Sequence, residues 1–137
     1  AEMGIRDSSP YTRALQTAQI ISVETGLRVE VDIDLHEWIP DQENRYETSQ
    51  ESFELAHEFT RFRGEYPPGE KLRWESLASM RQRMRRVADK YSDYDSVIFV
   101  SHGMALRCLT YIEKMHPAEI IECTYEKGQS DCVYSFT

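Results

Sequence analysis

The sequence predicts an α/β fold, a three-layer α/β/α sandwich around a mostly parallel sheet. The run Val97–Val100 is apolar without alternation, which is typical of a strand covered on both faces and therefore of a parallel sheet. Segments with helical spacing of apolar residues alternate with the strand candidates along the chain. The length of 137 residues fits one domain, so we expect a single domain over residues 1–137.

The first helix is expected over Tyr11–Thr25, where apolar residues recur at helical spacing. Ser8-Ser9-Pro10 precedes it and supplies a hydroxyl cap and a proline at the first turn. Gly26 provides the stop signal. The short stretch Leu27–Val31 that follows is a weaker candidate for a strand.

Two further helices are expected in the middle of the chain, Gln50–Arg63 and Trp74–Tyr91. The second of these carries apolar residues on one face and four arginines that should mostly point elsewhere. These arginines are Arg81, Arg83, Arg85 and Arg86. The acidic and polar stretch Pro40–Glu51 is interpreted as a mobile loop.

The last third of the chain begins with the buried strand Val97–Val100. Met104–Ile112 follows as a helix that is apolar on nearly all sides and is therefore expected to be buried. Asp131–Phe136 alternates between apolar and polar residues, which predicts a terminal strand and is compatible with a place at a sheet edge.

The composition excludes several classes of function. Lysine and arginine total 16 against 24 aspartates and glutamates, which gives a net charge of −8 and argues against nucleic acid as a partner. No apolar run approaches the roughly 18 residues that a membrane span needs. Three cysteines without a Cys-x-x-Cys pair fit a reducing compartment, so we expect a cytoplasmic protein. The histidines and cysteines lack metal-ligand spacing, and no metal or other cofactor is expected.

The segment Ser101-His102-Gly103 stands between a buried strand and a helix. Ligands of open α/β sheets bind beyond the carboxyl ends of the strands, where a helix start also presents unpaired N–H groups. Gly103 permits close approach of the backbone, and His102 can donate a hydrogen bond to an anion such as phosphate. A helix-capping histidine without a ligand explains the same pattern equally well.

A second candidate site lies at the start of the first helix. Ser9 can cap that helix, and Arg13 lies one turn further, where its guanidinium can reach back to the terminus. Paired guanidinium donors suit a phosphate. Taken alone, a solvated arginine in the first turn is the more common explanation.

Both segments occur in a known family. Ser8-Ser-Pro-Tyr-Thr-Arg-Ala-Leu-Gln-Thr-Ala18 and Ser101-His-Gly103 closely resemble two signature blocks of the histidine phosphatase superfamily, the phosphoglycerate-mutase-like proteins. Leu35-x-Glu37-Trp38 is similar to the segment that carries the general acid of the family, and Trp74-Glu75-Ser76 is also typical. The resemblance extends over nearly the whole chain.

The resemblance implies a metal-free transfer of a phosphoryl group through a phosphohistidine. Glu37 would be the general acid, and His102 and Arg13 would hold the phosphoryl oxygens, with Ser8, Ser9 and Gly103 framing the phosphate. Glu37 then has to stay protonated near neutral pH, which requires burial or neighbouring anionic charge, and Leu35 and Trp38 could form an apolar wall. Without the family, Glu37 would be interpreted as a solvated loop residue.

The chain departs from the family pattern in two places. The family nucleophile lies in an Arg-His-Gly motif, and no such motif occurs in the 137 residues. Of the other histidines, His57 is expected mid-helix and exposed, His116 at a helix start, and only His36 near the pocket. In addition, Ala1–Ile5 resembles a helix end, which leaves only Arg6 and Asp7 for the strand that the family places before Ser8. We therefore expect a sheet without its N-terminal strands.

Three functions are compatible with these observations. The first is an enzyme that hydrolyses small phosphomonoesters, of which this sequence is an inactive part because it lacks the nucleophile. The second is a non-catalytic module of the same fold that binds phosphate or another protein. The third is a phosphoglycerate-type mutase, which the short segment between Glu37 and Trp74 disfavours.

Overall fold

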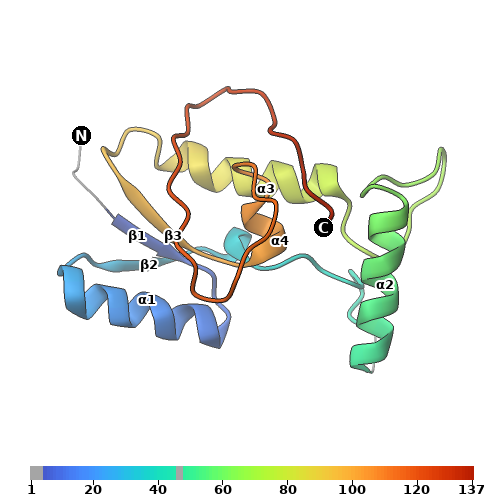
Figure 1. The fold of residues 1–137 in the computed structure, drawn as a ribbon, viewed down its shortest axis with the longest axis horizontal. Coiled ribbons are helices and arrows are strands. Elements are labelled where there is room, and N and C mark those ends of the chain that lie inside the picture. The colour runs from blue at the N-terminus through green and yellow to red at the C-terminus, as the bar shows by residue number, and fades with distance from the viewer. Residues whose placement is uncertain (1–4, 46–47) are drawn as a thin grey trace.

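The computed structural model describes residues 5–45 and 48–137. These residues form a parallel three-stranded sheet in the order β2-β1-β3, with β1 over Ile5–Ser8, β2 over Val29–Val31 and β3 over Val97–Val100. Helix α1 (Thr12–Thr25) covers one face of the sheet and α3 (Leu77–Lys90) the other (Figure 1). The predicted α/β sandwich is therefore confirmed.

The central strand β1 is the part of the sheet that the sequence analysis missed. Asp7 pairs with Glu30 of β2 on one side and with Phe99 of β3 on the other. The expectation that too few residues precede Ser8 for a strand was wrong, because Arg6, Asp7 and Ser8 are themselves strand residues. Residues 1–4, part of the expected helix end, lie outside the described residues.

Helix α1 agrees with its prediction, and Gly26 ends it in the left-handed conformation with φ of 72°. Its N-cap is Tyr11 rather than Ser9, although the Ser9 hydroxyl accepts the Tyr11 N–H at 3.2 Å. The expected helix after the polar loop is also present as α2 (Ser49–Arg61).

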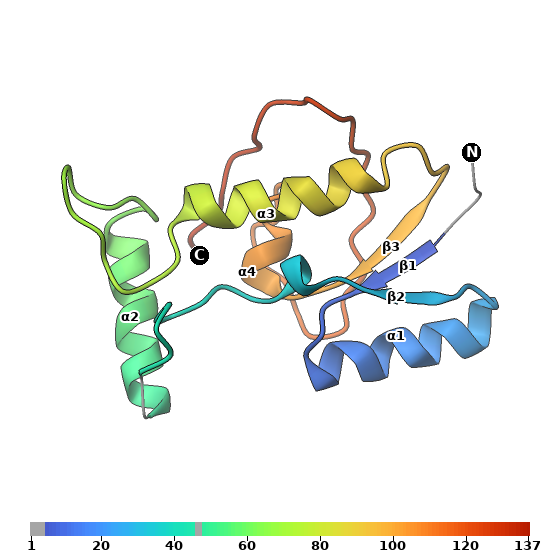
Figure 2. The same ribbon diagram turned by 180° about the vertical axis from the view of Figure 1, so that it is seen from behind.

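Helix α3 begins three residues later than predicted. The Ser76 side chain accepts the Ser79 N–H at 3.2 Å, and this cap fixes the helix start at Leu77. Trp74 lies in the preceding loop and is fully buried. Its ring packs at 5.3 Å from the ring of Phe59, a residue of α2 that also contacts Trp38 at 5.2 Å. This aromatic cluster joins α2 to α3 at the end of the molecule away from α1 (Figure 2).

Two elements expected in the last third of the chain differ in the structure. Helix α4 spans only Gly103–Leu106, because the next residues form tighter turns in which Cys108 and Leu109 bond to the third residue before them. Cys108 and Leu109 are nevertheless buried, so the apolar run reflects burial and not a continuing helix.

The segment Asp131–Phe136 is irregular, not a strand. Tyr134 and Phe136 pack against the Phe59 ring at 6.3 and 5.8 Å, and the carbonyl of Cys132 accepts a hydrogen bond from Arg81. Tyr134 and Phe136, two residues apart, therefore cover the aromatic cluster without a neighbouring strand. No helix in the described part of the chain is long and apolar enough to cross a membrane.

Candidate functional site

The candidate site lies where β1 and β3 end side by side. Parallel strands present their carboxyl ends at one edge of the sheet, and the Ser9 N–H donates to the Val100 carbonyl across this edge at 2.9 Å. The loops that follow the two strands bring Ser9 and His102 together, with 2.8 Å between Ser9 Oγ and His102 Nε2. The Tyr11 ring packs at 4.9 Å from the His102 ring.

Glu37 reaches the same place from the short helix η1 (Ile33–Leu35). Its carboxylate accepts the N–H groups of Met104 at 3.1 Å and Ala105 at 2.9 Å, and that of Trp38 at 2.8 Å. Glu37 therefore caps the N-terminus of α4 directly after His102 and is half-buried rather than a solvated loop residue.

This capping changes the local chemistry that the sequence suggested. Two of the N–H groups at the start of α4, which were expected to face a phosphate, are occupied by the Glu37 carboxylate. Leu35 and Trp38 are buried as expected, and both oxygens of Glu37 accept N–H bonds.

Arg13 and Ser8, two further predicted site residues, differ in exposure. Arg13 is exposed in the first turn of α1 and, with Pro10, Tyr11, Thr12 and Gln16, lines an open hollow of about 550 Å³. Ser8 is fully buried, and its hydroxyl donates to the Ser9 carbonyl at 2.9 Å. The structure thus brings Ser9, Glu37, His102 and Gly103 together. The Ser8 hydroxyl instead bonds to a backbone carbonyl.

The electrostatics around His102 favour a neutral imidazole. Burial, and then the positive charges of Arg13, His36 and Arg83, together lower the pKa of His102 to about 4. These charges surround a side chain that is only 8% exposed. An anion bound beside His102 would offset the positive charges that lower the pKa of its imidazole.

Of the remaining histidines, His36 lies near the site, and His57 and His116 are exposed elsewhere. His36 adjoins Glu37 and places Nδ1 2.6 Å from the Glu37 carbonyl oxygen, so it lies near the site as expected. His57 is exposed in the middle of α2, also as expected. His116 is exposed in an irregular segment, whereas a helix start was predicted there, because only isolated turns form after Pro117.

The sequence analysis missed two residues beside the site. Tyr11 contacts His102, and its position directly after Ser-Ser-Pro was the only signal. Arg83 was expected to point away from the apolar face of α3, but it is buried and forms an ion pair with Glu75. Its spacing from Met80 and Val87 places it on the buried face, which was a usable signal.

The fold and this edge of the sheet define an α/β protein with a small polar site at the carboxyl ends of its strands. The model of the histidine phosphatase superfamily (branch 1) matches residues 3–133, and the chain belongs to this family. No curated protein matches the chain.

Solved structures share the fold at low sequence identity. A candidate alpha-ribazole-5'-P phosphatase from Escherichia coli str. K-12 substr. MG1655 is 20% identical, with a TM-score of 0.55 over 80% of this chain and 55% of that protein. A protein described as mycobacterial hydrolase 1 is 22% identical, with a TM-score of 0.56 over 75% of this chain and 53% of that protein. The chain therefore matches about half the length of these two proteins.

Proposed function

We propose that the chain carries the phosphate-binding groups and the general acid of a phosphomonoester hydrolase that works through a phosphohistidine. The observation that supports this proposal best is the convergence of Glu37 and His102 at the start of α4, beside Ser9 and close to the charge of Arg13. Family membership supports a phosphorylated substrate, and the named activity of the Escherichia coli protein supports hydrolysis.

In the proposed reaction, a histidine nitrogen attacks phosphorus and forms an N–P bond while the P–O bond to the leaving alcohol breaks. His102 donates a hydrogen bond to a phosphoryl oxygen, Arg13 balances the charge on the phosphoryl oxygens, and Glu37 gives its proton to the leaving oxygen. Water then attacks phosphorus, the N–P bond breaks, and Glu37 takes the proton of the water. Glu37 therefore has to exchange one of its N–H contacts for a proton when the anionic phosphate binds.

The sequence of 137 residues contains no Arg-His-Gly motif, so we propose that this chain alone binds phosphate without turning over a substrate. The reaction that we propose uses protein cations and no metal. All three cysteines are free thiols, which supports the cytoplasmic location that we propose.

A second candidate function is a non-catalytic phosphate-binding or interaction module of the same fold, in which Ser9 and His102, 2.8 Å apart, would bind phosphate without a nucleophile.

Titration of the chain with inorganic phosphate, followed by calorimetry, tests the proposed binding site. His102→Ala and Arg13→Ala should each weaken binding by at least about tenfold, because charge-assisted hydrogen bonds to phosphate are lost. His57→Ala and Arg28→Ala are matched controls, since His57 is exposed on α2 and Arg28 precedes β2 at the other end of the sheet. Equal affinity in all four variants would contradict the site.

Turnover of p-nitrophenyl phosphate tests the proposed inactivity of the chain. We expect none. Turnover that disappears with both His102→Ala and Glu37→Ala would show that these residues suffice for catalysis, and it would refute both the inactivity and the non-catalytic alternative.

A further inference from the structure

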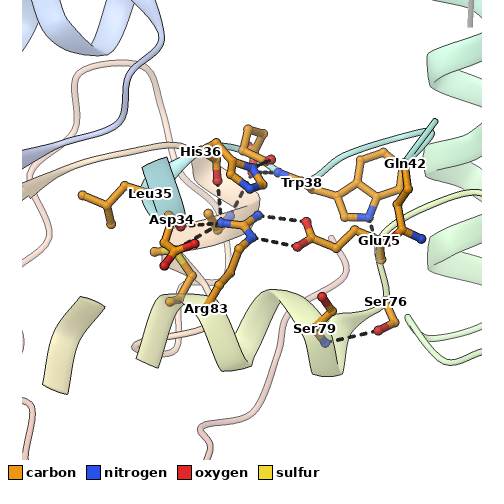
Figure 3. Close-up of polar contacts among 12 residues, drawn as sticks. Asp34, Leu35, His36, Trp38, Gln42, Glu75, Ser76, Ser79 and Arg83 are labelled. Atoms are coloured by element: carbon orange, nitrogen blue, oxygen red, sulfur yellow. Dashed lines mark hydrogen bonds and ion pairs between the residues drawn. The ribbon is translucent and has the colours of Figure 1, made fainter. Parts of the chain in front are cut away.

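Arg83 is a buried arginine whose three guanidinium nitrogens all have partners (Figure 3). Nε and one terminal nitrogen donate to the two oxygens of Glu75 at 2.7 and 2.9 Å. The other terminal nitrogen donates to the carbonyls of Asp34 and His36, both at 2.7 Å. One side chain of α3 thus holds the backbone of the segment that leads into Glu37.

Glu75 holds the same segment on the other side of Glu37. Its backbone carbonyl accepts the indole N–H of Trp38 at 2.8 Å, and its backbone N–H donates to the Ile39 carbonyl at 2.9 Å (Figure 3). Glu37 is therefore bracketed by two anchored neighbours, His36 before it and Trp38 after it.

The bracketing determines where the Glu37 carboxylate can point. Between the two anchors lies a single residue, and its carboxylate bonds to the N–H groups of Met104 and Ala105 next to His102. A loop without such anchors would sample several conformations, and in most of them the Glu37 carboxylate would not lie beside His102.

We infer that Arg83 and Glu75 are positioning residues that fix the carboxylate of Glu37 beside His102. The functional part of this inference rests on the proposed role of Glu37 as the general acid. The chemistry of the pair fits the task, because a guanidinium can donate to a carboxylate and to two carbonyls at once in a fixed plane. A lysine has three donors on a single nitrogen and an apolar residue has none, so neither can bond to all four of these oxygens at once.

The pair is unlike the other ion pairs of α3. Arg83 and Glu75 are 6% and 5% exposed, whereas Arg86, which pairs with the Asp34 side chain at 3.0 Å, is 61% exposed. A solvated pair contributes little rigidity, but a buried pair that also donates to backbone carbonyls fixes one arrangement. Arg86 is thus a matched control on the same helix that contacts the same segment.

Amide hydrogen exchange of the folded chain, measured by NMR, tests the inference without substrate or turnover. The variant is the double substitution Arg83→Met and Glu75→Met, because replacing both members of a buried ion pair avoids an unpaired buried charge. The amides of Trp38, Met104 and Ala105, which donate to Glu37, should exchange at least about tenfold faster. Glu37→Ala sets the limit expected when the carboxylate is absent.

The comparison amides are those of β3, which pairs with β1, and they should keep the rates of the parent chain. Arg86→Gln should change neither group. Unchanged exchange at Trp38, Met104 and Ala105, or an equal acceleration of these amides and of β3, would overturn the inference. If the double variant does not fold, Arg83→Lys serves instead, with the same expected pattern and the same contradicting outcomes.

Phosphate titration of the same variants separates this inference from the proposed function. If the parent chain binds no phosphate, the proposed function is refuted. The exchange rates then still decide whether Arg83 and Glu75 position the carboxylate. A parent chain that binds phosphate, with exchange unaffected by the double substitution, would remove only the positioning role.

Discussion

Asp7 should lower the stability of the protein as pH rises, and its replacement by asparagine should reverse this loss. Asp7 lies in the central strand, is fully buried, and has no hydrogen-bond partner for either carboxylate oxygen among the described residues. A buried carboxylate without partners is disfavoured relative to the neutral acid.

The size of the effect follows from the surroundings of Asp7. Burial raises the pKa of Asp7 to about 7, with smaller contributions from the negative charges of Asp32 and Glu30. Lys90 opposes the shift, but its ammonium group is 3.3 Å from Asp32. The Ser8 N–H opposes it only weakly, because neither oxygen of Asp7 reaches hydrogen-bond geometry.

Between pH 3.8 and 7 the folded state therefore holds a proton that the unfolded state releases. The free energy of unfolding then falls as pH rises through this window, and the total loss is about 4 kcal/mol above pH 7. Asp7→Asn keeps the shape of the side chain and cannot ionise. The variant should be more stable than the parent by up to about 4 kcal/mol at pH 8, on the order of 10 °C in Tm, and equally stable at pH 3.5.

The assay is urea unfolding of both proteins at several values from pH 3.5 to 8.5. The difference between them isolates Asp7, because other titrating groups contribute equally to both curves. Asp95→Asn, at an exposed aspartate before β3, is the control and should leave the curve of the parent unchanged. A difference between Asp7→Asn and the parent that does not grow with pH would refute the reasoning.

Three further predictions concern other parts of the molecule. His102 should titrate by NMR with a midpoint near 4, because burial and nearby cations lower the pKa of its imidazole to about 4. As pH falls below 6.5 the unfolded state takes up this proton first, so the free energy of unfolding falls with pH. A midpoint near 6.5 would contradict this prediction. Gly64→Ala should cost at least about 2 kcal/mol in urea unfolding, because φ is +72° and an added Cβ would lie 2.6 Å from the Leu77 Cβ. Gly69→Ala, with φ of +75° and open space, should cost only about 1 kcal/mol, and equal costs would be inconsistent with the overlap. Thr48→Ala should cost about 1 kcal/mol, because the side chain caps α2 through the Glu51 N–H at 3.2 Å, and an unchanged unfolding curve would exclude a contribution from the cap.

The sequence predicted the elements in which local signals agree with the fold. Helix α1 has apolar spacing, a proline at its start and a glycine at its end, and β3 is an uninterrupted apolar run. The strand β1 gave no such signal, because Arg6, Asp7 and Ser8 are all polar and yet buried. The Arg6 guanidinium is accommodated by hydrogen bonds to Ser22 and Thr25 of α1, an arrangement that exists only after the helix packs on the sheet.

The candidate site was likewise predicted only in part from the sequence. The resemblance to a family placed Ser9, His102 and Glu37 at one site, and Ser9 and His102 do meet, because the loops after the parallel strands β1 and β3 converge. The capping of α4 by Glu37 and the contacts of Arg83 with Glu75 depend on which side chain lies opposite which backbone group. Such pairings are set by tertiary packing and leave no local pattern in the sequence.

The arrangement of the sheet has a consequence for how this protein acquires its shape during synthesis. β1 pairs with β3, and the contact between Ser9 and His102 joins residues 93 positions apart. The chain must therefore be synthesised as far as β3 before β1 can pair with this neighbour. Pairings across such long separations form slowly because a large loop must close first. The polar strand β1 thus lacks one of its two neighbours until β3 has been synthesised. The candidate site forms in the same step that completes the sheet.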